Sequence, residues 1–238
     1  MVLGGIIPKE ISKPAKFFLI NNCITGFANG LSNVILILYL ISLGFKSTDI
    51  GLLMMIITVT QAILTIPMGI LADRYSRKWI AILGQIPFII AFFIMLSTKS
   101  LVLFLIGFAL IGLSNATGVI NTPIYSSYYK NSDMDRAFAL LSFIRIFSMS
   151  MGSLMGFIPP IFMSIYKYTR TYSYWLTFVF TYIIFLLSVP FLILAVKNLK
   201  EKRNNNRFTF NLKSKMLVIK FALLGFIGQI GASIFFSL

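Results

Sequence analysis

The sequence predicts an all-α integral membrane protein, a bundle of six transmembrane helices followed by a seventh. Of its 238 residues, 58% are hydrophobic and only 11% are charged, whereas soluble domains are about 45–50% apolar and about 25% charged. The mean hydropathy is +0.91. Apolar runs alternate with short charged segments, and many reach the roughly 20 residues that a membrane-crossing helix needs. These features exclude an ordinary water-soluble domain and a disordered chain.

Seven apolar runs are expected to form these helices. The first is too long for the core of a signal peptide, which has about 7–15 residues, so we expect it to remain as a helix. The runs cover residues 17–43, 50–72, 79–97, 101–128, 137–165, 174–196 and 216–238. The predicted organisation is an N-terminal segment, a six-helix unit, a basic linker and a seventh helix, at residues 1–16, 17–196, 197–215 and 216–238.

The distribution of basic residues predicts the orientation of these helices. The chain has 21 Lys and Arg against 6 Asp and Glu. Fifteen of these cations lie in the N-terminal segment and in the loops after the second, fourth and sixth runs, whereas four lie in the opposite loops. Because Lys and Arg accumulate in cytoplasmic loops, we expect a multi-pass protein of the plasma membrane with a cytoplasmic N-terminus. The lipid bilayer, rather than nucleic acid, is then the partner that explains the basic charge.

The residue inventory argues against an enzyme. The chain has no His, and its single Cys23 excludes an internal disulfide and a site built from several cysteines. The commonest metal ligand and general base are therefore missing. No acidic residue lies deep in a predicted helix, and neither a Gly-x-Ser-x-Gly elbow nor a Gly-x-x-x-x-Gly-Lys phosphate loop is present. We predict no catalytic residue, no metal and no cofactor.

The loop after the second run carries the most specific motif. It reads Gly-Ile-Leu-Ala-Asp-Arg-Tyr-Ser-Arg-Lys over residues 69–78. Taken alone, one acid followed by three cations is typical of a cytoplasmic loop. The segment also resembles the signature Gly-x-Leu-Ala-Asp-Arg-x-Gly-Arg-Lys, which lies between helices two and three of the major facilitator superfamily of secondary transporters. The match includes Gly69, Leu71, Ala72, Asp73, Arg74, Arg77 and Lys78, whereas Ser76 replaces a preferred Gly.

The resemblance implies two six-helix halves that bind a small solute between them. It also implies that the motif holds the cytoplasmic side shut against the opposite half, through the gating residues Gly69, Asp73, Arg74, Arg77 and Lys78. Two weaker likenesses accompany it. Asp135-Arg136 resembles the charged loop between helices four and five. Gly152-x-x-x-Gly156 resembles a motif of some proton-coupled exporters, but such spacing more often serves helix packing.

Polar residues in the first and fourth runs are candidates for the substrate pathway. They recur at steps of three and four, which places each set on one helix face. The alternative is a set of hydrogen bonds between helices, worth about 0.6 kcal/mol each. Helices one and four line the central cavity in the family that the chain resembles, which favours the pathway. The candidates are Asn22, Thr25, Asn29 and Asn33 in the first run and Asn115, Thr122 and Tyr125 in the fourth.

Arg145 is a further pathway candidate, because it lies inside the fifth run. Placing a cation there costs about 2.5–3.5 kcal/mol. Three interpretations stay open: the side chain extends back to the headgroups, attracts an anionic solute, or pairs with Asp73 or Asp135.

The predicted function is transport of a small solute across the membrane by alternating access. Because the resemblance implies two halves and the chain ends about one helix into the second, we expect a single chain to be incomplete. Either a second chain supplies the missing half, or the chain is a remnant. The alternative is an accessory membrane subunit that transports nothing itself. Sugars, amino acids, organic anions and drugs fit the polar stripes equally, so no substrate class is predicted.

Overall fold

The computed structural model describes residues 8, 10–197 and 199. The predicted linker beyond residue 199, the seventh helix and most of the first nine residues lie outside the described residues. The helices are α1 (Lys13–Ser42), α2 (Ser47–Arg74), α3 (Arg77–Leu83), α4 (Gln85–Ser97), α5 (Leu101–Thr117), α6 (Asn121–Ser126), α7 (Met134–Leu154), α8 (Ile158–Tyr166) and α9 (Arg170–Val196). Short 3-10 turns at Gly118–Ile120, Asn131–Asp133 and Met155–Phe157 connect some of them.

Within the described residues, six helical segments are long and apolar enough to cross a membrane. They overlap the first six predicted runs one for one, which confirms the predicted all-α membrane fold. We number these segments one to six as spans. They cover Lys13–Ser42, Ser47–Arg74, Arg77–Ser97, Leu101–Ser126, Asn131–Tyr166 and Arg170–Val196.

Spans three, four and five are each interrupted within their length. Span three breaks at Gly84, whose carbonyl accepts a hydrogen bond from the Ser114 hydroxyl of α5 at 2.7 Å. A Cβ atom at Gly84 would overlap the Thr117 side chain, so this break lies against span four. Span five breaks before Pro159 and Pro160, which occupy the first turn of α8, where a residue without an N–H is tolerated.

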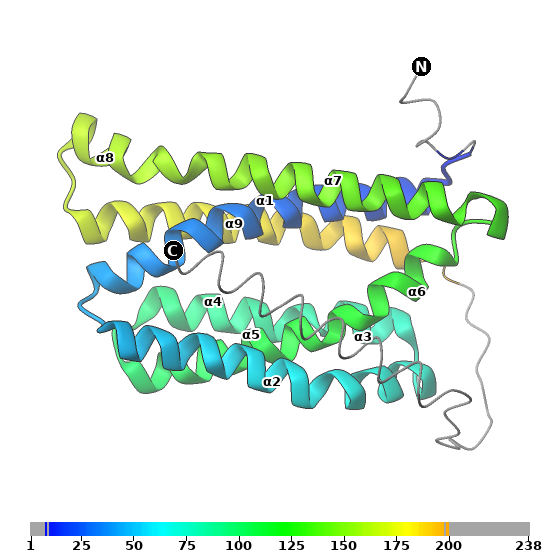
Figure 1. Cartoon of the computed structure of the whole chain (residues 1–238), viewed down its shortest axis with the longest axis horizontal. Helices are drawn as coiled ribbons and strands as arrows, with labels where there is room; N and C mark the ends of the chain where they lie inside the picture. Colours follow the sequence, from blue (N-terminus) through cyan, green and yellow to red (C-terminus); the bar gives the residue numbers. More distant parts are fainter. Residues whose placement is uncertain (1–7, 9, 198, 200–238) are drawn as a thin grey trace. The chain divides into compact units, whose positions relative to one another are not determined.

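The helices pack as two groups of three spans. In the first group α1 packs against both α7 and α9, and in the second α5 packs against both α2 and α4. Figure 1 shows α7, α1 and α9 running side by side, with α2, α4 and α5 forming the other group. Span one packs against spans five and six, and span four packs against spans two and three. The contact pattern is therefore the same when each of spans one, two and three trades places with span four, five or six, respectively. Spans one and four are therefore equivalent, each being the central helix of its group.

Aromatic side chains join the two groups. The Phe92 ring of α4 stacks on the Phe178 ring of α9 with centroids 4.7 Å apart, and on the Tyr182 ring at 5.6 Å. Phe178 also stacks on Tyr39 of α1 at 5.5 Å. The indole nitrogen of Trp175 donates a hydrogen bond to the Leu96 carbonyl at 3.0 Å. Offset ring pairs of this kind add about 0.5–1.5 kcal/mol each to the burial of their surface.

The crossing of α1 and α7 is built on glycine. A Cβ atom at Gly30 would overlap the Met149 carbonyl, and one at Gly152 would overlap the Phe27 carbonyl. A Cβ at Gly156 would lie 2.7 Å from a methyl group of Val34. Small residues at this spacing allow two backbones to approach closely. Gly152-x-x-x-Gly156 thus serves helix packing, the more common role of two glycines at this spacing.

Candidate gate and pathway residues

Asp73 and Arg77 form an ion pair across the turn between α2 and α3. Asp73 lies in the last turn of α2 and Arg77 is the first residue of α3, and the Arg77 Nη2 and Asp73 Oδ1 atoms are 3.0 Å apart. The side chains are 58% and 40% exposed, respectively, so the pair contributes only about 0–1 kcal/mol to stability. The main effect of the ion pair is on orientation, because it fixes the direction in which the Arg77 guanidinium points.

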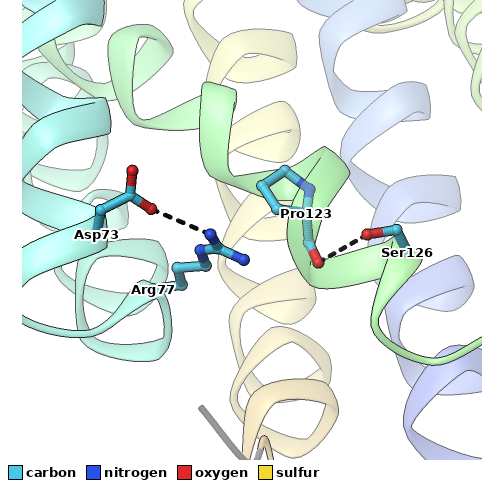
Figure 2. A network of polar contacts seen from close by, with 4 residues as sticks. All are labelled: Asp73, Arg77, Pro123 and Ser126. Atoms are coloured by element: carbon cyan, nitrogen blue, oxygen red, sulfur yellow. Dashed lines mark hydrogen bonds and ion pairs between the residues drawn. The ribbon is translucent and has the colours of Figure 1, made fainter. Parts of the chain in front are cut away.

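The guanidinium of Arg77 points toward span four. Figure 2 shows Arg77 extending from α3 into the space between Asp73 and Pro123 of α6. The Pro123 carbonyl accepts a hydrogen bond from the Ser126 hydroxyl at 3.0 Å. The turn after span two and the end of span four therefore lie together at one end of the bundle, which we call the motif end.

The other gating candidates occupy three different positions around this pair. The Lys78 ammonium donates to the Lys197 carbonyl at 3.0 Å, which links the start of α3 to the end of α9. Arg74 is exposed and forms no ion pair with any described residue. Gly69 lies one turn before Asp73, and no described atom lies within 4 Å of the position that its Cβ would occupy.

On α1 the polar candidates divide into two kinds. The Asn22 amide donates to the Phe18 carbonyl at 2.9 Å and the Thr25 hydroxyl donates to the Asn21 carbonyl at 2.8 Å, so both bond to their own helix. Asn29 and Asn33 are exposed, and their side chains form no hydrogen bond with any described residue. The alternative interpretation was that these side chains form hydrogen bonds between helices. None of the four forms such a bond with a described residue.

Span four presents a matching set. Asn115 at the end of α5 and Thr122 in α6 are exposed, as is the neighbouring Asn121. Their side chains make no hydrogen bonds within the part of the chain that the structure describes. The central helices of both groups thus carry exposed, unpartnered polar side chains.

Tyr125 lies apart from this set. Its side chain is fully buried, stacked on Phe18 with ring centroids 5.3 Å apart. Its hydroxyl is 3.1 Å from that of Tyr129. The structure therefore brings Tyr125 into an aromatic cluster at the motif end instead of onto an exposed face.

Arg145 is exposed on α7 and forms no ion pair with any described residue. The helix begins at Met134, three residues earlier than the run predicted from the sequence. At 1.5 Å per residue, Arg145 lies about 16 Å from this start, deeper than expected. Its carbonyl lies 3.1 Å from the position that a Cβ atom of Gly26 would take, so its backbone adjoins α1.

Gln61 is a candidate that the sequence analysis missed. It lies near the middle of α2, exposed, with its side chain amide unpartnered among the described residues. The available signal was the single amide in the run 50–72, which has no repeat of amides such as the one that marks the stripes of spans one and four.

Comparison with known proteins agrees with this arrangement. The family model described as Major Facilitator Superfamily matches residues 18–238, nearly the whole chain. The chain belongs to the major facilitator superfamily. Its members are secondary transporters, and the six apolar spans accordingly make this chain a multi-pass membrane protein.

A relative in Buchnera aphidicola subsp. Schizaphis graminum (strain Sg) is described as an uncharacterized transporter. The two sequences are 43% identical over 70 residues, which cover 29% of this chain and 18% of the relative. The chain thus matches less than a fifth of that protein's length. The relative's description as a transporter agrees with the superfamily that the family model gives.

Proposed function

We propose that spans one to six form one half of a major facilitator transporter, which carries a small solute across the plasma membrane by alternating access. In this proposal the motif end faces the cytoplasm, as does the N-terminus. The observation that carries it is the set of unpartnered polar side chains, Asn29, Asn33, Asn115, Asn121 and Thr122, on the two central helices.

These side chains are unsuited to lipid. Moving an amide or hydroxyl from water to an apolar medium without a hydrogen bond costs roughly 2–7 kcal/mol. Polar groups within membrane spans therefore face a protein interior or a water-filled cavity. Because Asn33 and Asn115 are exposed in this half, a water-filled pathway beside α1 and α5 would satisfy them. Amides both donate and accept hydrogen bonds, so they suit a polar solute.

An opposing half would cover α2 and α7. Of all residues in α2, only Ile50, Leu53 and Ala72 are buried, and α7 buries only Ala137, Ser148 and Gly152. The open space at Gly69 supports the same view. Gly30 and Gly152, at the crossing of α1 and α7, are explained by the backbone of the facing helix, whereas no described atom lies within 4 Å of the position that a Cβ of Gly69 would take. We infer that a helix of the opposing half approaches there.

Asp73 and Arg77 would then act as the gate. A pair worth so little to stability can open without disrupting the fold. We propose that Asp73, held by Arg77, contacts the opposing half when the motif end is closed, with Gly69 making room for that contact. Arg74 and Lys78 would supply the adjacent positive charge.

The rival hypothesis is an accessory subunit whose exposed amides are covered by a partner and remain dry. Cysteine accessibility distinguishes the two. Cys23 is the single cysteine, and Cys23→Ser gives a background in which a hydroxyl can still accept the bond from Ser148. Asn33→Cys and Asn115→Cys are then compared with Phe180→Cys. Phe180 is exposed, apolar and about as far from its helix end as Asn33.

In membrane vesicles, we expect a membrane-impermeant maleimide to label Asn33→Cys and Asn115→Cys at least tenfold faster than Phe180→Cys. We also expect Asp73→Asn to raise labelling of Asn33→Cys from the motif side and lower it from the other side. This second readout needs no knowledge of the solute. Equal labelling rates at all three positions would contradict the pathway. A labelling rate of Asn33→Cys that Asp73→Asn does not change would favour the accessory subunit.

A further inference from the structure

A cavity of about 550 Å³ lies at the end of the bundle opposite to the motif end. The last turn of α1, the loop between α4 and α5, and the first turns of α9 line it. None of the pathway candidates contributes to its lining. It belongs to spans one, three and six, and is therefore a separate site from the proposed pathway.

Two hydrogen-bond acceptors at the adjoining helix ends are already occupied. Helices α1 and α4 both end here, and the last carbonyls of a helix are its negative pole. The Thr171 hydroxyl donates to the Ser42 carbonyl at 2.8 Å, and the Trp175 indole donates to the Leu96 carbonyl at 3.0 Å. Two residues of α9 therefore satisfy acceptors that would otherwise face the cavity.

Hydrogen-bond donors, by contrast, are left over. Tyr39 is only 2% exposed and lines the cavity, yet its hydroxyl bonds to no described residue. The Lys99 ammonium forms no ion pair with a described residue. Thr169 precedes α9 without capping it, so the positive N-terminal pole of a 27-residue helix remains uncapped by a side chain. The Tyr39 hydroxyl therefore has a proton to donate to a ligand in the cavity.

The surrounding charge is also positive. No acidic residue lines the cavity. Lys46 and Lys167 lie in the loops at the same end, and Arg170 is the first residue of α9. One acid is also present there, Asp49 in the first turn of α2, whose carboxylate accepts a bond from the Lys46 backbone N–H at 3.1 Å. The rest of the lining combines hydroxyl side chains with the apolar Leu43, Leu96 and Trp175. The Trp175 ring stacks on Tyr172 with centroids 5.8 Å apart.

We propose that this cavity binds an anion, a phosphate or carboxylate group carried on an apolar or aromatic body. The charged group would lie between Lys99 and the start of α9, and accept a hydrogen bond from the Tyr39 hydroxyl. The apolar body would lie against Trp175. The volume falls within the 300–1,000 Å³ range of small-molecule sites, and exceeds what a bare phosphate ion fills. A lipid headgroup and a water-soluble organic anion share this chemistry.

The test uses Trp175 as the reporter. The chain has two tryptophans, and Trp79 is exposed in α3, outside the cavity. The full chain with Trp79→Phe is placed in phosphatidylcholine nanodiscs, and Trp175 fluorescence is recorded. One arm replaces increasing fractions of the lipid with phosphatidylglycerol, and the other adds benzyl phosphate to phosphatidylcholine discs. The responding arm identifies the source of the anion.

We expect a saturable change in Trp175 emission in at least one arm. Lys99→Gln should weaken the apparent affinity at least tenfold and Tyr39→Phe severalfold, because the latter removes only the hydroxyl. Lys46→Gln is the matched control, a lysine at the same end that does not line the cavity, and should change the affinity less than twofold. No saturable change in either arm, or binding by Lys99→Gln as tight as the parent, would overturn the proposal. Neither outcome depends on transport.

Discussion

Gly152 of α7 lies directly against the main-chain carbonyl of Phe27 on α1, at a distance that leaves no room for a side chain. The relationship is reciprocal, because Gly30 of α1 lies in the same way against the carbonyl of Met149 on α7. The Ser153 hydroxyl donates to the Gly30 carbonyl at 3.2 Å beside this contact. Spans one and five are thus held by backbone contact more than by large side chains.

The first prediction concerns this crossing. Gly152→Ala should force the two backbones apart and destabilise the bundle by about 1–3 kcal/mol, as overpacking does. Gly51→Ala is the control, because Gly51 is exposed on α2 with nothing within 4 Å. Alanine there should be neutral or stabilise by about 0.5–1 kcal/mol. Thermal unfolding in detergent measures both, and equal melting temperatures for the two variants would contradict the close crossing.

The second prediction concerns the junction between the two groups of spans. Phe92 is 2% exposed and stacks on Phe178, whereas its neighbour Phe93 is 66% exposed. Phe92→Ala should reduce the free energy of unfolding by about 3–5 kcal/mol, the range for a buried phenylalanine. Phe93→Ala removes the same atoms from a position without such packing. A loss as large for Phe93→Ala, measured by denaturant titration, would argue against the aromatic junction.

The third prediction separates structural from pathway amides on α1. The buried Asn21 amide donates to the Ser188 carbonyl of α9 at 2.9 Å, whereas Asn33 is exposed and bonds to no described residue. Asn21→Ala should cost about 0.6–1.7 kcal/mol, the span measured for hydrogen bonds between membrane helices. Asn33→Ala should stay within about 0.5 kcal/mol of the parent. The reverse order of stabilities would remove Asn33 from the proposed pathway.

The fourth prediction concerns alkaline pH. Burial raises the pKa of Tyr128, in the turn after span four, and its hydroxyl donates to the Ala195 carbonyl at 2.9 Å. The folded state therefore favours the protonated phenol. Above pH 10 the unfolded chain loses this proton first, so the stabilisation by Tyr128 is complete below about pH 10 and falls as the pH rises further.

Unfolding of the parent and Tyr128→Phe across pH 8–11 tests this reasoning. Below about pH 10 the parent should be more stable by about 0.5–1.5 kcal/mol, the usual contribution of one hydrogen bond. Above that pH the difference should shrink by up to 1.4 kcal/mol per pH unit. Lysine side chains also titrate in this pH range, but they affect the parent and Tyr128→Phe alike and so cancel in the difference between their free energies of unfolding. A difference that stays constant with pH would contradict the raised pKa.

The positions of the six spans could be predicted from the sequence, because the run lengths and charges distinguish lipid from water. Their packing faces could not. In a membrane, an apolar face that touches lipid has the same composition as one that touches protein. Nothing in the spacing of Phe92 and Phe93, for example, indicated which of them packs inside.

Polar side chains indicated the exposed helix faces better than apolar side chains did, but not at every position. The stripes on spans one and four do include exposed amides such as Asn29 and Asn115, and their role in a pathway stays a prediction. Tyr125 continued the stripe in sequence, yet its ring is stacked on Phe18. An aromatic ring with one polar atom satisfies the spacing of a polar face and the demands of a packed interior equally well, so spacing alone could not place it.

The contact pattern also determines when each described span gains its packing partners during synthesis. Spans two, three and four can pack together as soon as Ser126 has entered the membrane, because α5 of span four packs against both α2 and α4. Span one is made earliest, but its partners α7 and α9 begin at Met134 and Arg170. Until these partners have been synthesised, Asn21 and the glycines of α1 that they cover remain exposed. Among the described spans, the first to be made therefore waits longest for its packing partners.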